Sequence, residues 1–330
     1  MLKLTERFAE VADALGIGAT SIVEKDYYVV ELLALLHPLR FDSHQLVFAG
    51  GTALAKAGIR LNRMSEDVDI KLIPNHMFLA KSRTQRKAIR RQVVQAIQHA
   101  IEQSVLFSFD PAEPHTYLDE YRYAEIPIRY PQAFAQSPCL RPFIKLELIE
   151  SALIEPAEPR SVSSLIFDLT QFGTQLTGFP AVTVRSTLVE KIVSMLRRTA
   201  AVARNSERSD DPALVRHVYD HFRITQAFDF EHTALIPLLQ NVISADVERF
   251  GGQHPQMRET PLDELRFGLE QLTSNPIHQE RYHHFVTPMV FGQAPVTWQD
   301  AYECFQKSVT SLLDSVEQTH QNWGSLKLSN

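Results

Sequence analysis

A buried strand that passes into a helix through a pair of glycines is the feature that most constrains this fold. HQLVFA, residues 44–49, has the apolar run of a short buried strand, and Gly50 and Gly51 precede the helical pattern TALAKAGIRL, residues 52–61. Residues without a Cβ let a backbone approach a phosphate closely, and a helix start offers unpaired N–H groups and a dipole that favours anions. With the hydroxyl of Thr52 nearby, the segment predicts a phosphate-binding turn, although a glycine pair is also typical of an ordinary turn.

The next strand carries paired carboxylates on one face. In SEDVDIKLI, residues 65–73, the alternation of side chains along a strand turns the apolar residues towards a core and places Asp67, Asp69 and Lys71 together on the other face. Two adjacent carboxylates repel each other unless a cation lies between them, and hard oxygen ligands favour Mg²⁺. Asp67 and Asp69 are therefore candidate metal ligands and catalytic residues, although such a pair also arises by chance on exposed strands.

A third carboxylate is predicted in PFIKLELIE, residues 142–150, where Glu147 shares a strand face with Lys145. If this strand lies beside residues 65–73, Glu147 joins the two aspartates, and the cluster could hold two metal ions about 4 Å apart for in-line displacement. An ordinary cross-strand salt bridge is the alternative interpretation of Glu147 and Lys145.

A basic run follows the acidic strand. Six cations and no acidic residue occur from Lys81 to Arg91, on a segment that reads as a helix. The overall net charge of −6 argues against indiscriminate binding of nucleic acid, but a local patch can still release counterions from phosphates. The candidate RNA-binding residues are Arg86, Lys87, Arg90 and Arg91; a solvated helix face is the alternative.

Periodicity divides the chain into an α/β half and a helical half. The first half, residues 1–185, has helices at about 4–15 and 21–36, the latter opened by a capping box of Ser21 and Glu24. Further strands are predicted in residues 104–109, 123–130, 141–150, 164–169 and 181–186. The second half, residues 186–330, has helical spacing throughout, with a loop at 201–212. With 44% hydrophobic and 22% charged residues, the composition is that of a folded protein.

Other classes of site have weak support. The two cysteines are far apart, and the histidines form no zinc-ligand motif such as HExxH. The N-terminus mixes charges into its apolar pattern, and no stretch reaches the roughly 18 apolar residues of a membrane span. We therefore expect a cytoplasmic protein with neither a signal peptide nor a membrane anchor.

The joint pattern of strand, Gly-Gly, helix and two acidic strands resembles the polymerase-β-like nucleotidyltransferases. FAGGTALAK followed by RMSEDVDI is similar in particular to the AbiEii/AbiGii-type toxins of bacterial type IV toxin–antitoxin systems, with Arg63, Ser65, Glu66, Asp67 and Asp69 at matching positions. EKDYYVVELL, residues 24–33, also resembles an N-terminal segment of that family.

The resemblance implies an α+β fold, with a mixed-sheet nucleotidyltransferase core in residues 1–185 and a mainly α-helical domain in residues 186–330. It implies that Gly50, Gly51, Thr52 and Ser65 contact the nucleotide. TLVEKIVSMLRR resembles the family helix whose lysine binds nucleotide, which places that role on Lys191, and RHVYD places a catalytic aspartate on Asp220. His217 departs from the aspartate of many members. Without the resemblance, Lys191 and Asp220 would be ordinary helix-surface residues.

The function implied is Mg²⁺-dependent transfer of nucleotides from an NTP, with two ions, to an RNA acceptor such as a tRNA 3′ end or to another macromolecule. A cognate antitoxin would restrain the activity, and the family is associated with phage defence. The alternatives are a small-molecule nucleotidyltransferase of the aminoglycoside-modifying kind and a nucleotide-binding interaction module without turnover.

Overall fold

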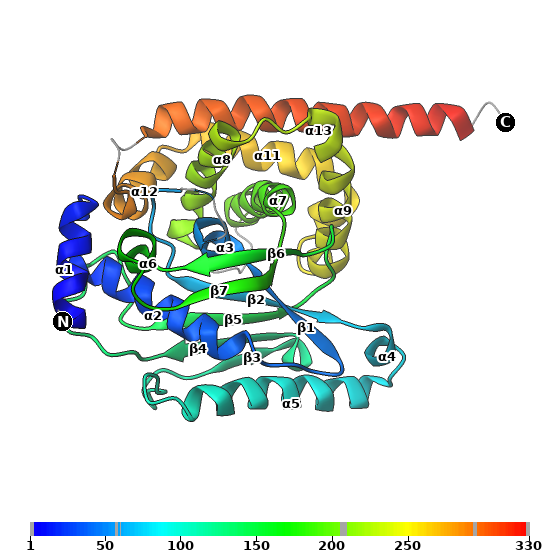
Figure 1. The fold of residues 1–330 in the computed structure, drawn as a ribbon. Coiled ribbons are helices and arrows are strands. Elements are labelled where there is room, and N and C mark those ends of the chain that lie inside the picture. The colour runs from blue at the N-terminus through cyan, green and yellow to red at the C-terminus, as the bar shows by residue number, and fades with distance from the viewer. Residues whose placement is uncertain (1–2, 57–58, 60, 205–209, 293–295, 328–330) are drawn as a thin grey trace. The chain divides into compact units, whose positions relative to one another are not determined.

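The chain forms two compact units. The computed structural model describes residues 3–56, 59, 61–204, 210–292 and 296–327 (Figure 1). One unit, called the sheet unit, comprises the residues up to Thr183 together with Phe291 and Gly292. The other, called the helical unit, comprises Val184–Val290 and the described residues from 296 onward.

A mixed sheet is the centre of the sheet unit. Its strands are β1 (His44–Ala49), β2 (Asp67–Pro74), β3 (Thr116–Leu118), β4 (Tyr123–Ile128), β5 (Ile144–Glu150), β6 (Glu158–Ser163) and β7 (Gln175–Ala181). In the described part of the chain these seven strands are ordered β3-β4-β5-β2-β1-β7-β6. β2 is central, antiparallel to β1 and parallel to β5, so the predicted α+β class with a mixed sheet is confirmed.

The two faces of the sheet differ in chemistry because the period of two holds along β2. Val68, Ile70 and Leu72 are at most 1% exposed, whereas Asp67, Asp69 and the other residues of the opposite face are half-buried. The helices of this unit are α1 (Leu4–Ala14), α2 (Thr20–Leu36), α3 (Gly50–Lys56), α4 (His76–Leu79), α5 (Arg83–Glu102) and α6 (Leu165–Thr170), with a 3₁₀ turn η1 (Asp119–Tyr121). Figure 1 shows α5 and α3 on opposite sides of the sheet.

Several predicted elements take another form. Residues 164–169 form helix α6, because the side chain of Ser164 accepts a hydrogen bond from the N–H of Phe167 and caps the helix. Residues 104–109 were predicted as a strand, and in the structure Ser108 of this segment pairs with Arg129 in an isolated β-bridge. Residues 181–186 are divided between the end of β7 and the start of the first helix of the helical unit.

The predicted capping box of α2 is also wrong. The helix begins at Thr20 after Ala19, and the carboxylate of Glu24 accepts hydrogen bonds instead from the backbone N–H groups of Ala133 and Phe134. The predicted helix at 52–61 ends at Lys56 as α3, and residues 57, 58 and 60 lie outside the described part. At Glu24 a tertiary contact with the loop at 133–134 therefore overrides the local capping pattern.

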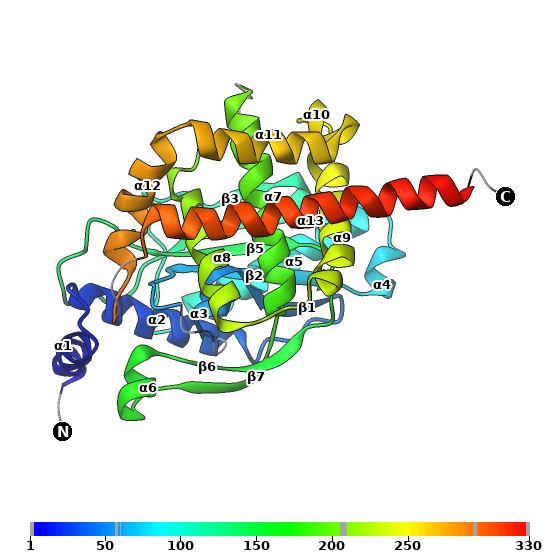
Figure 2. The same cartoon turned by 90° about the horizontal axis from the view of Figure 1, so that it is seen from above.

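The helical unit is built around a buried central helix. Its elements are α7 (Val184–Ala203), η2 (Pro212–Val215), α8 (Arg216–Ala227), α9 (His232–Phe250), α10 (Pro255–Glu259), α11 (Pro261–Ser274), α12 (Ile277–Phe285), η3 (Thr287–Met289) and α13 (Trp298–Lys327). α7 contacts α8, α9 and α11, and α13 crosses the same three helices (Figure 2). Gly268 of α11 lets α7 approach closely, since a Cβ there would overlap the backbone carbonyl of Leu196. The loop predicted at 201–212 begins later, because α7 continues to Ala203, and its residues 205–209 lie outside the described part.

The basic helix α5 contains one structural arginine. Arg90 is 2% exposed, and its Nε and Nη2 donate to the two carboxylate oxygens of Glu150 at 2.6 and 2.8 Å. Burial alone would raise the pKa of Glu150, but hydrogen bonds from His44 and Arg90 outweigh it and lower the pKa to about 2. Arg90 therefore stabilises the fold, and its predicted part in binding RNA is corrected. Lys87 and Arg91 are exposed and Arg86 is half-buried.

Among the helices that the structure describes, none combines the length and apolar character needed to cross a bilayer.

Candidate active site

Carboxylates from neighbouring strands form a row on the polar face of the sheet. β2 and β5 are parallel neighbours in a register that pairs Asp69 with Glu147 and Asp67 with Lys145. The strand adjacency assumed for Glu147 is therefore observed. β4 extends the row, because Glu125 lies opposite Glu147 in the antiparallel pairing of β4 and β5. The acidic row thus consists of Asp69, Glu147 and Glu125, at the strand spacing of about 4.8 Å.

The sequence did not identify Glu125 as a site residue. Its strand was predicted in residues 123–130, and period two places Tyr123 and Glu125 on one face. The missing information was which strand lies beside which. In the structure the hydroxyl of Tyr123 donates to Glu125 at 2.8 Å, and burial together with the nearby carboxylates of Glu147 and Glu125 raises the pKa of Tyr123.

The turn at Gly50 brings the backbone against the acidic row. Gly50 has φ +75°, which favours glycine, and a Cβ there would lie 2.7 Å from Cγ of Asp69 and overlap its carboxylate. The sequence predicted that a phosphate approaches the backbone at this turn. In the structure the group that lies close to Gly50 is the carboxylate of Asp69. Gly51 follows in the first turn of α3.

Thr52 connects the start of α3 to the start of β2. It is fully buried, its hydroxyl donates to the backbone carbonyl of Asp67, and the hydroxyl of Ser65 lies 3.0 Å away. Thr52 and Ser65, both predicted to contact nucleotide, are thus brought together. The buried Thr52 positions the residues around Asp67, while Ser65 is half-buried.

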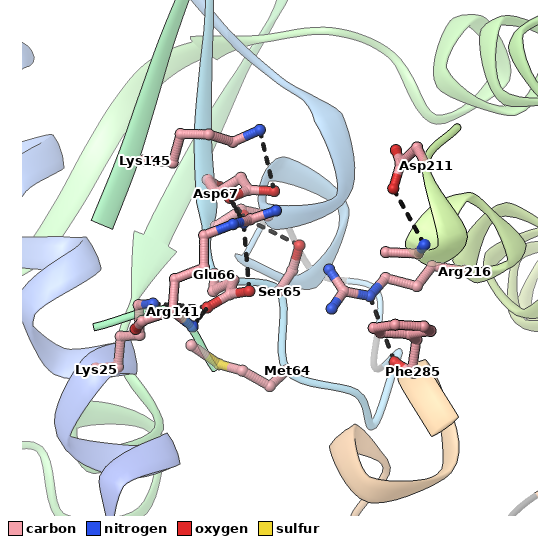
Figure 3. Close-up of polar contacts among 12 residues, drawn as sticks. Lys25, Met64, Ser65, Glu66, Asp67, Arg141, Lys145, Asp211, Arg216 and Phe285 are labelled. Carbon is pink, nitrogen blue, oxygen red and sulfur yellow. Dashed lines mark hydrogen bonds and ion pairs between the residues drawn. The ribbon is translucent and has the colours of Figure 1, made fainter. Parts of the chain in front are cut away.

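Two cationic side chains lie against the carboxylates. Nη1 of Arg141 is 2.5 Å from Oδ1 of Asp67, and Nζ of Lys145 is 3.9 Å from Oδ2 of the same residue (Figure 3). Lys145 also forms an ion pair with Glu147. Burial would lower the pKa of Lys145, but Asp67 and Glu147 outweigh it and raise that pKa. The protein therefore balances part of the negative charge of its own carboxylates.

Within the described ranges no three His, Cys, Asp or Glu side chains converge closely enough to hold a metal ion. This agrees with the pairing of Asp67 with Arg141 and of Glu147 with Lys145. Mg²⁺ in nucleotide sites needs one or two carboxylates, and waters and substrate phosphates complete its shell. The adjacent, half-buried Asp67 and Asp69 fit that requirement for one ion. The second ion and the ligand role of Glu147 stay predictions.

The segment Glu24-Lys25-Asp26 of α2 binds three different parts of the sheet unit. Glu24 accepts hydrogen bonds from the loop at 133–134, and Asp26 pairs with Lys56 of α3 and accepts from the N–H of Leu165. Lys25 is fully buried and lies 2.6 Å from Glu66, directly before β2. All three side chains are at most 4% exposed, so the segment holds the surroundings of the acidic row in place.

In the helical unit, the two residues predicted to act on substrate contact each other. Nζ of Lys191, on α7, is 2.9 Å from Oδ2 of Asp220, on α8. Asp220 is fully buried and Lys191 is 8% exposed, so each neutralises the other in a poorly solvated environment. Without the family resemblance both would have been assigned to helix surfaces, whereas both are buried. Because they form an ion pair, substituting either one also affects its partner.

Comparison with known proteins identifies the class as nucleotidyltransferases. Residues 33–304 match the family model described as nucleotidyl transferase AbiEii toxin, type IV toxin–antitoxin system. This match spans most of the chain and parts of both units, and the chain belongs to that family. The expected enzyme class, nucleotidyltransferase, is thereby confirmed.

The solved structure of MenT4 shares the fold at low sequence identity. MenT4, a nucleotidyltransferase toxin from Mycobacterium tuberculosis H37Rv, superimposes with a TM-score of 0.62 at 20% identity, over 96% of this chain and 92% of that one. JHP933 from Helicobacter pylori gives a TM-score of 0.42 at 14% identity, over 92% of this chain and 98% of its own. A comparison with curated protein sequences gave no match.

The Gly50 turn generates a test with a matched control. Gly50→Ala should displace the Asp69 carboxylate and lower nucleotidyl transfer about 10²-fold, because displacements of 1 Å at an active site have effects of that size. Gly178→Ala is the control, since Gly178 has a similar φ of +71° but nothing within 4 Å of an added Cβ. Both variants should lose about 1–2 kcal/mol of stability to the left-handed backbone. Equal transfer rates in the two variants would show that the Asp69 position does not matter.

Proposed function

We propose that this chain transfers a nucleotide from an NTP to an RNA acceptor, with a tRNA 3′ end as the preferred acceptor, and that a cognate antitoxin protein restrains it. The observation that carries the proposal is the pair Asp67 and Asp69 on the polar face of β2, with Glu147 of β5 in register and the Gly50 turn beside it. Membership of a nucleotidyltransferase toxin family supports both the reaction and the antitoxin.

In this proposal Asp67 and Asp69 hold Mg²⁺, with Glu147 as a further ligand for a second ion. When bound, the metal neutralises phosphate charge and orients the reacting oxygens. Gly50, Gly51 and Ser65 border the carboxylates and contact the nucleotide. Thr52 keeps Ser65 and the start of β2 in position through its buried hydroxyl.

Lys191 and Asp220 take the roles that the family resemblance gives them. The ammonium group of Lys191 binds phosphate oxygens, and the carboxylate of Asp220 orients or accepts the proton of the acceptor hydroxyl. The family match supports this assignment because it includes both residues. Their ion pair holds the ammonium group and the carboxylate beside each other before substrate binds.

An RNA acceptor is supported by the exposed cations of α5. Lys87 and Arg91 are exposed and Arg86 is half-buried, and the described residues of the helix before Glu102 include no acidic side chain. Cations on one helix surface bind a polyanion by releasing its counterions. A small aminoglycoside would not need such a surface, which favours RNA as the acceptor class.

The function itself is tested by labelled transfer. Purified protein should transfer label from at least one of the four NTPs to total tRNA, and chelation of divalent cations should stop the transfer. Asp67→Asn and Asp69→Asn should each abolish it with the fold intact, because each removes one metal-binding charge from a half-buried surface. Asp110→Asn is the matched control, an aspartate paired with Arg129. Label appearing on aminoglycosides and not on tRNA would refute the RNA acceptor.

The roles of Lys191 and Asp220 are separated by kinetics. Lys191→Met should chiefly raise KM for the NTP, whereas Asp220→Asn should lower kcat by roughly 10²–10⁴, the usual contribution of a general base. Because the two residues form a buried pair, thermal unfolding of each variant must be measured alongside. Arg198→Gln, which removes the half-buried ion pair between Arg198 of α7 and Asp211, should change neither constant. Wild-type kcat in Asp220→Asn would exclude its catalytic role.

The acceptor surface is tested by the salt dependence of RNA binding. Replacing Arg86, Lys87 and Arg91 together by alanine should lower the log–log salt slope by up to about three units. Arg90 is left in place because it stabilises the fold. A triple variant of the exposed residues Arg249, Arg258 and Lys307 removes the same charge from the helical unit and should keep the wild-type slope. Equal slopes in both triple variants would mean that α5 is only a solvated surface.

A further inference from the structure

We propose that Arg141 binds the triphosphate of the incoming nucleotide, and that it does so by leaving Asp67, so that nucleotide and divalent cation bind cooperatively. The inference rests on the proposed function and concerns the same site. The sequence gave no role to Arg141, which lies directly before β5.

The backbone of Arg141 is fixed on both sides by a buried ion pair. Its N–H donates to Oε2 of Glu66 at 2.9 Å, and its carbonyl accepts from Nζ of Lys25 at 2.8 Å. Lys25 and Glu66 are themselves 2.6 Å apart, with side chains 0% and 2% exposed. The Cα of Arg141 is therefore held at a fixed place beside the acidic strand, whichever partner its side chain takes.

The side chain of Arg141 is accessible to solvent, whereas the ion pair that fixes its backbone is buried. It is 35% exposed, and its Nη1 contacts Oδ1 of Asp67 at 2.5 Å and Oε1 of Glu66 at 3.3 Å (Figure 3). A guanidinium has five N–H donors in a planar fork that matches phosphate oxygens. A rigid backbone with an accessible guanidinium is the arrangement expected of an anion-binding arginine.

The present partner of that guanidinium is a proposed metal ligand. Arg141 and a divalent cation compete for Asp67, because two positive groups beside one carboxylate repel each other and each weakens the contact of the other. Lys145 lies farther from Asp67, with its Nζ 3.9 Å from Oδ2, and forms its closer ion pair with Glu147. Cation binding therefore releases the Arg141 side chain from Asp67, and the triphosphate provides a new anionic partner nearby.

Glu66 satisfies only part of the guanidinium, because one Nη1–Oε1 contact of 3.3 Å leaves the other N–H donors of the fork for phosphate oxygens. Its Oε2 already accepts from Lys25 and from the N–H of Arg141. If the cation weakens the contact between Asp67 and Arg141 and the triphosphate binds Arg141, the two ligands are thermodynamically linked. The nucleotide and the divalent cation then strengthen each other's binding by the same factor.

The test measures binding without any acceptor, so that no transfer is required. Mn²⁺ binding is followed by electron paramagnetic resonance, and binding of each of the four NTPs by calorimetry, with and without Mg²⁺. For wild type we expect weak Mn²⁺ binding alone and tighter binding with NTP. Arg141→Gln should bind Mn²⁺ alone several-fold more tightly, because Asp67 is released, and should bind NTP about 10–100-fold more weakly, as expected for lost charge-assisted hydrogen bonds.

Two further variants make the result specific. Arg141→Lys keeps a positive charge without the fork, so NTP binding should weaken while Mn²⁺ binding alone stays closer to wild type. Arg129→Gln removes an exposed arginine paired with Asp110 and should change neither affinity. Circular dichroism and thermal unfolding confirm that each variant is folded.

The outcomes separate this inference from the proposed function. Wild-type NTP affinity in Arg141→Gln would overturn the triphosphate contact, and unchanged Mn²⁺ affinity in the same variant would overturn the exchange at Asp67. If wild type bound no NTP under any condition, both proposals would fail. If binding followed the expected pattern but label reached only aminoglycosides, the role of Arg141 would stand and the RNA acceptor would fall.

Discussion

The buried ion pair between Lys25 and Glu66 is the interaction on which the rest of the active-site architecture depends. Removing two charges from water is costly, and a buried pair is tolerated when further hydrogen bonds satisfy both partners. Here the backbone N–H and carbonyl of Arg141 supply those bonds, and the pair connects α2 to the residues before β2 and before β5. Loss of one partner would leave an uncompensated charge and would release two of the segments that carry the candidate site.

Carboxylates that share one face of the sheet repel each other, which explains why cationic side chains lie beside them. Asp67, Asp69 and Glu147 occupy adjacent positions on β2 and β5, and their repulsion is reduced by Arg141 and Lys145. These cations keep the site folded before substrate binds, and they also compete with any metal for Asp67. The same contacts that stabilise the sheet unit therefore set how its ligands bind, and the Gly50 turn leaves just enough room for Asp69.

Cations in this chain have different roles according to burial. Arg90 is enclosed with Glu150 and with the ring of Phe78, 5.3 Å from its guanidinium carbon, while Lys87 and Arg91 on the same helix face solvent. Lys191 is enclosed with Asp220 in the same manner. A charge that is buried with a partner contributes to folding, whereas an exposed charge is available to bind another molecule.

The sequence by itself determined the features that depend on local periodicity. The alternation in residues 65–73 placed Asp67 and Asp69 on one face, the glycine pair marked the end of β1, and helical spacing predicted α7, α8 and α9. The motifs around Gly50 and Asp67 also indicated the toxin family that the whole-chain comparison then identified. These features need no knowledge of which segments are neighbours.

Only the tertiary structure decided which residues meet. The alternation of side chains shows which face of a strand a residue lies on, but not which strand is its neighbour. The pairing of Asp69 with Glu147, and the place of Glu125 in the acidic row, were therefore known only from the order of strands in the sheet. A run of basic residues in the sequence does not reveal which of them is buried. Arg90 was therefore assigned to the RNA-binding surface of α5, although its side chain is buried. Lys25, Glu66 and Arg141 are separated by 41 and 75 residues along the chain, and no local pattern records a contact over such distances. Contacts of this kind follow from how the whole chain folds, because burial and pairing are properties of the assembled core and not of a segment.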